Sequence, residues 1–187
     1  DEYSSSDASV LRDHLIDRGL TINTIKRMYS TIRSVINLTI NEEGIDCSNA
    51  FSNTYMPDLD DSKQRQPIDN EDIKCIQNEC KKIDDEKRWL IALISDTGMR
   101  LSEAVGLLKE DLKVNESIPY VDIKPHPWRS LKTKSSIRKV PLVGASLWSA
   151  KRILESDNDT PFAFPLYTNE KKCNSNSASA ALNKWLR

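Results

Sequence analysis

The sequence predicts a mainly α-helical protein with a small antiparallel β-sheet, an α+β fold divided into two domains. Apolar residues recur at helical spacing in several segments, and residues typical of helix caps separate these segments. Two short stretches, 118–123 and 137–142, enclose a polar turn and predict a small β-hairpin. Between residues 45 and 68, Asn, Ser, Asp and Pro dominate, which is typical of a linker.

Two helices are expected before this linker. Ser6 or Asp7 can cap the first helix, which runs to Gly19 with Val10, Leu11 and Leu15 on one face. The second begins near 21–23 and ends near Gly44. Its apolar face is predicted to comprise Ile25, Met28, Ile32, Val35 and Ile36.

The remaining helices are expected after the linker. Pro67 and Asp69 mark the start of a helix that runs to about Lys82, and another spans 85–96. Gly98 can adopt the left-handed conformation that ends a helix, and a new helix begins directly after it. Further helices are predicted at 144–155 and 177–187. We therefore expect one domain at 1–62, including the linker, and a second at 63–187.

The composition argues against several classes of protein. The formal net charge is −1, so any surface for a polyanion must come from a local cluster of charge. The four cysteines form no Cys-x-x-Cys pair and lie away from the histidines, which predicts reduced thiols in a cytosolic protein rather than a zinc site. No apolar run reaches the roughly 18–20 residues of a membrane span, so no membrane association is expected.

Arg100 stands at the junction of two predicted helices. A guanidinium offers several fixed donors to a phosphate, and a helix N-terminus adds backbone N–H groups. On a rigid junction the side chain loses little freedom when it binds an anion. The alternative interpretation is a surface ion pair between Arg100 and Glu103, worth at most about 1 kcal/mol.

A long basic segment follows this junction. No acidic residue occurs between Ile123 and Leu154, which is typical of a surface that contacts a polyanion. The alternative is an ordinary solvated basic face. The basic residues of the segment are Lys124, Arg129, Lys132, Lys134, Arg138, Lys139, Lys151 and Arg152.

Residues 97–107, Thr-Gly-Met-Arg-Leu-Ser-Glu-Ala-Val-Gly-Leu, followed by Asp111-Leu112, resemble the first catalytic-arginine box of the tyrosine recombinases, the phage integrase family. In that family the arginine binds the scissile DNA phosphate. The resemblance therefore implies that Arg100 is catalytic and that Glu103 and Asp111 support the fold.

Residues 131–142, Leu-Lys-Thr-Lys-Ser-Ser-Ile-Arg-Lys-Val-Pro-Leu, resemble the β-hairpin of the same family. Its lysine enters the cleavage site and protonates the leaving 5′ oxygen, a role that speeds departure by roughly 10²- to 10⁴-fold. The resemblance assigns this role to Lys132, with Lys134 as the close alternative because hairpin length varies. Arg138 and Lys139 are interpreted as contacts to backbone phosphates or as charges on the hairpin face, and Lys134 and Arg129 as contacts to DNA. His126 is expected to serve packing in a rigid loop, with a phosphate contact as the alternative.

Residues 7–44 resemble part of the helical core-binding domain that precedes the recombinase catalytic domain. The segment Gly19-Leu-Thr-Ile-Asn-Thr-Ile-Lys-Arg-Met28 carries Lys26 and Arg27 at positions expected to be exposed. In the family such a helix lies against DNA, so Lys26 and Arg27 are predicted to bind DNA.

Two catalytic features of the family have no counterpart at the expected positions. These are the His-x-x-Arg box and the tyrosine that forms a covalent 3′-phosphotyrosyl link. His126 and Arg129 match the letters of the box, but they precede the hairpin and prolines flank the histidine, so the match is interpreted as coincidence. We therefore expect a fragment at both ends, inactive alone.

The resemblance implies a site-specific recombinase for DNA integration and recombination in mobile elements. Its expected partners are double-stranded DNA and, in the full-length form, further copies in a tetramer, without metal or other cofactor. The expected location is the bacterial cytoplasm, in association with the nucleoid. Two alternatives are a naturally truncated DNA-binding protein without catalysis and a helical interaction protein without a nucleic-acid role.

Overall fold

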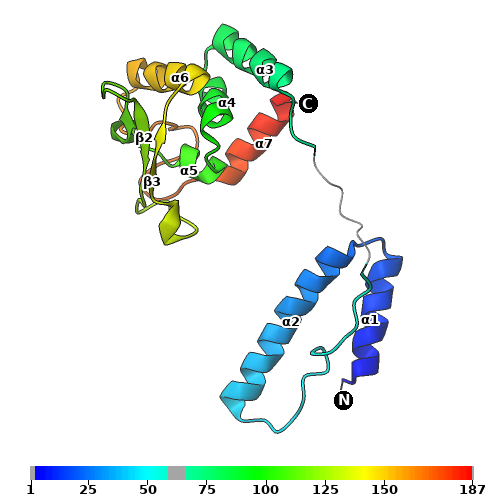
Figure 1. The fold of residues 1–187 in the computed structure, drawn as a ribbon. Coiled ribbons are helices and arrows are strands. Elements are labelled where there is room, and N and C mark those ends of the chain that lie inside the picture. The colour runs from blue at the N-terminus through cyan, green and yellow to red at the C-terminus, as the bar shows by residue number, and fades with distance from the viewer. Residues whose placement is uncertain (1–2, 59–65, 187) are drawn as a thin grey trace. The chain divides into compact units, whose positions relative to one another are not determined.

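The computed structural model describes residues 3–58 and 66–186. The chain folds into two compact units, Asp1–Pro67 and Ile68–Arg187 (Figure 1). The domain boundary expected between 62 and 63 lies outside the described residues, as does most of the polar run 58–63.

The first unit contains α1 (Ser5–Asp17) and α2 (Ile22–Glu43). Ser4 caps α1: its hydroxyl accepts a hydrogen bond from the backbone N–H of Asp7, whose carboxylate accepts one from the backbone N–H of Ser4. The cap expected at Ser6 or Asp7 was wrong, because Asp7 fills the third helical position of this reciprocal pair. α2 begins after Thr21 and ends at the left-handed Gly44, as predicted.

The core of the first unit lies on a narrower face than the sequence predicts. Leu15 and Ile25 are buried as expected, but Val10 is 65% exposed and Val35 is 59% exposed. Tyr29, absent from the predicted face, is fully buried and donates its hydroxyl hydrogen bond to the carbonyl of Ala8. Among residues 3–58, α1 and α2 are the helices that cover each other, so outer apolar positions stay in contact with solvent.

The beginning of the predicted linker packs against these helices. The ring of Phe51 meets the ring of Tyr29 edge-on at 5.4 Å. Arg12 Nη1 donates to the carbonyl of Tyr55 at 2.8 Å. The described part of this segment therefore belongs to the first unit rather than forming a free connection.

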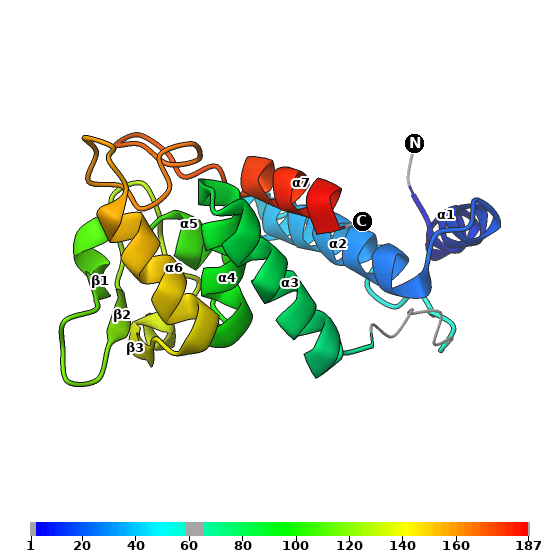
Figure 2. The ribbon, with the colours of Figure 1, turned by 90° about the horizontal axis from the view of Figure 1, so that it is seen from above.

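The second unit is built around a buried helix. α4 (Glu86–Thr97) packs against α3 (Asn70–Ile83), α6 (Gly144–Glu155) and α7 (Ser175–Leu186). Figure 2 shows α3, α4 and α6 in succession, with the sheet on one side of them. Asp85 caps α4 and Gly98 ends it with φ 60°, as the sequence predicts. The short α5 (Leu101–Val105) follows at once.

The sheet of the second unit has three antiparallel strands in the order β1-β2-β3. The predicted hairpin is confirmed by β2 (Tyr120–Ile123) and β3 (Arg138–Pro141), whereas the two-residue β1 (Leu112–Lys113) was not expected. Ile123 pairs with Arg138, and Asp122 pairs with Lys139. Because paired residues share a face of a sheet and neighbours alternate, Arg138 and Lys139 lie on opposite faces.

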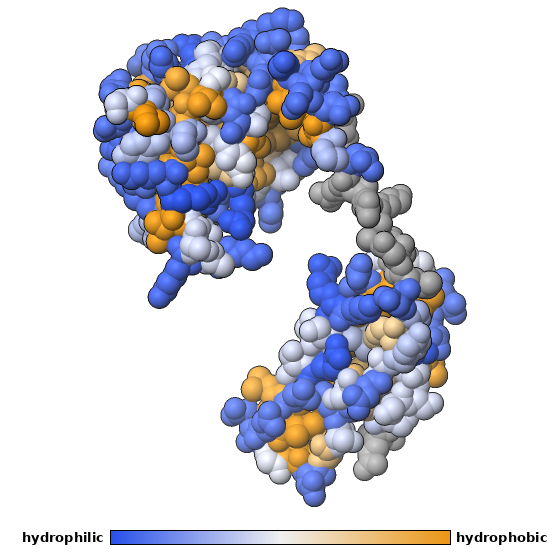
Figure 3. All heavy atoms as spheres, viewed as in Figure 1, coloured by the Kyte–Doolittle hydropathy of each residue, from blue (hydrophilic) through white to orange (hydrophobic). Residues whose placement is uncertain are grey.

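Short turns of 3-10 helix complete this unit at η1 (Lys109–Asp111) and η2 (Lys134–Ser136). The second of these lies in the turn that projects from the hairpin, and Figure 3 shows a mixture of hydrophilic and hydrophobic surface there. Within the described part of the chain, no helix has the length and apolar character that crossing a membrane requires.

Candidate functional site

Arg100 lies at the N-terminus of α5, directly after the end of α4. Its backbone N–H donates to Glu103 Oε2 at 3.0 Å, and its Nη1 donates to Glu103 Oε1 at 2.8 Å. The side chain of Arg100 is 53% exposed, whereas that of Glu103 is 3% exposed. The ion pair considered in the sequence analysis therefore forms, but it is not a surface pair, because its acidic partner is buried.

Arg138 brings a second guanidinium to the same carboxylate. Its Nη2 donates to Glu103 Oε2 at 2.9 Å, and its Nη1 donates to the carbonyl of Ser136 at 2.9 Å. Burial by itself raises the pKa of Glu103, but the hydrogen bonds from Arg138 and Arg100 outweigh burial and hold that pKa at about 2. Glu103 is therefore ionised at neutral pH and supports the fold, as predicted.

The two guanidiniums face a common cavity of about 380 Å³. Two cations against one buried carboxylate leave a net positive charge there. Hydroxyl groups add donors: Ser136 Oγ accepts from Arg100 Nη1 at 3.3 Å and shares a hydrogen bond with Thr133 Oγ1 at 3.0 Å. Such a set of donors suits an oxyanion such as phosphate. The cavity is lined by Gly98, Arg100, Thr133, Ser135, Ser136 and Arg138.

Lys132 and Lys134 flank the cavity-lining residue Thr133 along the chain, and both are exposed. Lys134 opens the η2 turn, whereas Lys132 precedes it. Among the described residues, neither lysine side chain has a hydrogen bond or an ion pair to the protein. Both ammonium groups thus remain available to a ligand, and the choice between them stays open.

Lys139 lies on the opposite face of the hairpin from this cavity. Its Nζ sits 4.6 Å from the centre of the Tyr120 ring, in a cation–π contact on the exposed side of the sheet. Lys26 and Arg27, the other predicted binding residues, belong to α2 of the first unit, where Arg27 is exposed and Lys26 is half-buried.

Arg129 requires a correction. It was expected to contact DNA, but the residue is only 4% exposed, and its Nη2 donates to the carbonyl of Lys124 at 2.7 Å. Burial lowers the pKa of its guanidinium. Its side chain packs against Gly106, where a Cβ atom would come within 2.8 Å of Arg129 Cδ. This position inside the second unit does not fit the expected contact.

His126 serves packing, as predicted. Its ring stacks on Trp128 with centroids 4.9 Å apart, and its Nε2 lies 2.7 Å from Asp111 Oδ2 in a hydrogen bond. Asp111 is fully buried and also forms an ion pair with Lys124 at 2.9 Å. Asp111 therefore supports the loop before the hairpin, in agreement with its predicted structural role.

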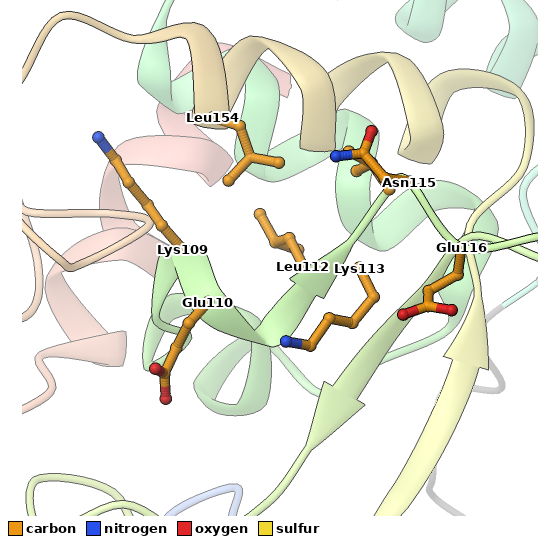
Figure 4. A pocket seen from close by; sticks show the side chains of 8 residues that line it. Lys109, Glu110, Leu112, Lys113, Asn115, Glu116 and Leu154 are labelled. Atoms are coloured by element: carbon orange, nitrogen blue, oxygen red, sulfur yellow. The ribbon is translucent and has the colours of Figure 1, made fainter.

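A separate hollow of about 530 Å³ shares no lining residue with the arginine cavity (Figure 4). Leu112 and Leu154 lie at its centre, and side chains of both charges surround them. Lys109 is already bonded to the carbonyl of Asn158 and Glu110 to Lys124, so the hollow does not favour a polyanion. Among residues 3–58 and 66–186, no group of His, Cys, Asp and Glu side chains is arranged to hold a metal ion.

Thr133 and Ser136 line the cavity, although they were not among the predicted site residues. Arg138 and Lys139, which the sequence did not distinguish, lie on opposite faces of the hairpin. The signal that separates them is the alternation of the strand: Arg138 and Val140 share one face, and Val140 pairs with the buried Val121.

Comparison with known proteins shows that residues 66–187 match the phage integrase family. No curated protein sequence matches the chain. Among solved structures, the integrase of the Tn1549 transposon in complex with circular intermediate DNA has 18% sequence identity and a TM-score of 0.73. The similarity covers 100% of this chain and 64% of the Tn1549 chain, so the sequence spans less than two thirds of that relative.

A variant of the same integrase bound to transposon right end DNA has 21% identity and a TM-score of 0.65. That match covers 90% of this chain and 56% of the variant chain. At these identities the similarity shows a shared fold.

Proposed function

The chain belongs to the phage integrase family. From this premise we propose that it is part of a site-specific recombinase. Such a recombinase binds double-stranded DNA, cleaves its strands and rejoins them. Arg100 binds the scissile phosphate. Lys132, or Lys134 in its place, protonates the leaving 5′ oxygen. Lys26, Arg27, Arg138 and Lys139 contact the DNA backbone.

The observation that carries this proposal is the cavity at the α4–α5 junction. Arg100 is fixed there by Glu103, so little side-chain freedom is lost when it binds an anion. The exposed lysines on the adjoining turn are long enough to approach a group bound there and transfer a proton. Arginine and lysine supply the positive charge at the phosphate, so no metal or other cofactor is part of the proposal.

We propose further that this polypeptide alone does not cleave DNA. The attack on phosphorus needs a nucleophilic tyrosine, and none of the five tyrosines occupies the position the family requires. A covalent protein–DNA adduct formed by the 187-residue chain would contradict this proposal. Action as a tetramer and association with the bacterial nucleoid belong to the proposal for the full-length protein.

DNA binding is tested by fluorescence anisotropy with a labelled duplex at several salt concentrations. The proposal requires affinity that falls steeply as salt rises, because bound lysines and arginines release counterions from phosphates. Arg100→Ala should weaken binding. Arg152→Ala is the matched control, because Arg152 is already paired with Asp84 and Glu155. A helical interaction protein without a nucleic-acid role would show no such salt dependence.

The second candidate is a DNA-binding protein without catalysis. The exposed lysines of the hairpin, Lys132, Lys134 and Lys139, support it as well as they support the recombinase. Sequencing the coding DNA beyond the codon for Arg187 separates the two. A reading frame that supplies His-x-x-Arg and then a tyrosine favours the recombinase, whereas an immediate stop codon favours DNA binding alone.

A further inference from the structure

We infer that Arg138 binds the same phosphate group as Arg100, so that the β-hairpin supplies a phosphate ligand as well as the lysine. This inference rests on the proposed function and refines it, because a general contact with the DNA backbone would place Arg138 on any neighbouring phosphate.

The first support is the shared carboxylate. Glu103 accepts from Arg100 at Oε1 (2.8 Å) and from Arg138 at Oε2 (2.9 Å) and, more weakly, at Oε1 (3.4 Å), so one carboxylate holds both guanidiniums side by side. Two like charges so close repel each other, and the buried carboxylate between them offsets that repulsion. An oxyanion in the cavity would add a second bridging negative charge.

The second support is the set of guanidinium N–H donors that have no acceptor within the described part of the protein. No protein acceptor is found among the described residues for Nε and Nη2 of Arg100 or for Nε of Arg138. Both arginines line the same cavity, together with the hydroxyls of Thr133 and Ser136. A phosphodiester has two non-bridging oxygens, and each guanidinium can donate to one of them.

The third support is the contrast with the next residue. Lys139 follows Arg138 directly and carries the same charge, but it lies over Tyr120 on the other face of the sheet. It therefore does not line the cavity, so a place on β3 does not by itself bring a positive charge to this site.

The test is an NMR titration of the 187-residue chain with inorganic phosphate at constant ionic strength. Arg138→Gln and Arg100→Gln should each weaken phosphate binding about tenfold or more, because a hydrogen bond to a charged group contributes about 1.5–3 kcal/mol. Arg152→Gln should stay within about twofold of the wild type, because Arg152 does not line the cavity and is already paired with Asp84 and Glu155.

Arg138→Gln leaves Glu103 with fewer partners and could unfold the second unit. Arg138→Lys keeps the charge but loses the forked donor geometry, and circular dichroism checks that it folds. Weakened phosphate binding by folded Arg138→Lys supports the inference. Wild-type affinity in this variant, or in folded Arg138→Gln, overturns it.

The same variants distinguish this inference from the proposed function. If Arg100→Gln loses phosphate and duplex DNA while the Arg138 variants keep phosphate, only the inference fails. If the wild-type chain binds duplex DNA without any salt dependence, the proposed function fails, whatever the phosphate titration gives.

Discussion

The guanidinium of Arg138 donates to both carboxylate oxygens of Glu103, through Nη2 to Oε2 at 2.9 Å and through Nη1 to Oε1 at 3.4 Å. The two residues are 35 positions apart in the sequence, on β3 and α5. This ion pair, whose carboxylate is buried, joins the hairpin to the helix junction that carries Arg100. The strength of the pair should therefore affect the stability of the second unit and the shape of the cavity lined by Arg100 and Arg138.

The first prediction concerns Glu103→Gln. The pKa of Glu103 is lowered from 4.5 to about 2, so the folded state favours the ionised carboxyl. Its contribution to stability is complete above about pH 4.5 and is lost as the pH falls toward 2. We expect the variant to lose about 3 kcal/mol of unfolding free energy at pH 7 and much less near pH 2.

Urea unfolding at pH 7, 4 and 2.5 measures this difference. Glu155→Gln serves as the control and should change stability by less than about 0.5 kcal/mol, because Glu155 is exposed and, within the described part of the chain, its ion pair is with Arg152. An equal loss for Glu103→Gln at every pH would show that the missing charge is not the cause.

The second prediction concerns Asp96, at the end of α4. Its Oδ2 accepts the backbone N–H groups of Ala145 at 2.8 Å and Ser146 at 3.1 Å, which caps α6 from another helix. Asp96→Ala should lower the unfolding free energy by about 1–2 kcal/mol. Asp96→Asn keeps an acceptor and should lose less than half of that, and thermal unfolding of both variants is the measurement.

The third prediction concerns Gly106, whose missing side chain leaves room for buried Arg129. A Cβ at this position would meet Arg129 Cδ and Nε at 2.8 Å, and the buried arginine has little room to move. Gly106→Ala should cost about 1–3 kcal/mol of stability. In the double variant, the losses of stability from Gly106→Ala and Arg129→Ala should not add, because removing the arginine side chain removes the clash. If the two losses are simply additive, the clash with Arg129 is not the cause of the Gly106→Ala effect.

The fourth prediction concerns the lysines of the turn. Lys132→Ala and Lys134→Ala should each weaken duplex binding to a similar degree for different DNA sequences, because phosphate contacts carry no base information. Each should also reduce the slope of log affinity against log salt by about 1. An unchanged slope for either lysine would mean that this side chain does not contact phosphate in the complex.

The helix junction and the hairpin could be predicted from the sequence because local signals determine them. Gly98 ends α4 through a backbone conformation that glycine favours, and strand alternation with a polar turn defines β2 and β3. Arg100 could be placed at the junction for the same reason. The family resemblance then added the role of a phosphate ligand.

The burial of Arg129 could not be predicted, because it depends on Gly106, which lies on a different element. The exposure of Val35 depends on how much of α2 the short α1 and the following segment can cover, and helical spacing does not contain that information. β1, with two residues, is too short to produce a pattern. The shared use of Glu103 by two arginines is a tertiary contact that only the fold reveals.

The sequence separation of Glu103 and Arg138 also has a consequence for biosynthesis. At roughly 5–20 residues per second, a ribosome adds the intervening segment in about 2–7 seconds. During that interval the nascent chain carries Arg100 but lacks the strand that closes the cavity. The affinity for phosphate proposed here would therefore reach its full strength only after the hairpin has been translated and has docked, which limits premature capture of phosphate at this cavity by unfinished polypeptides.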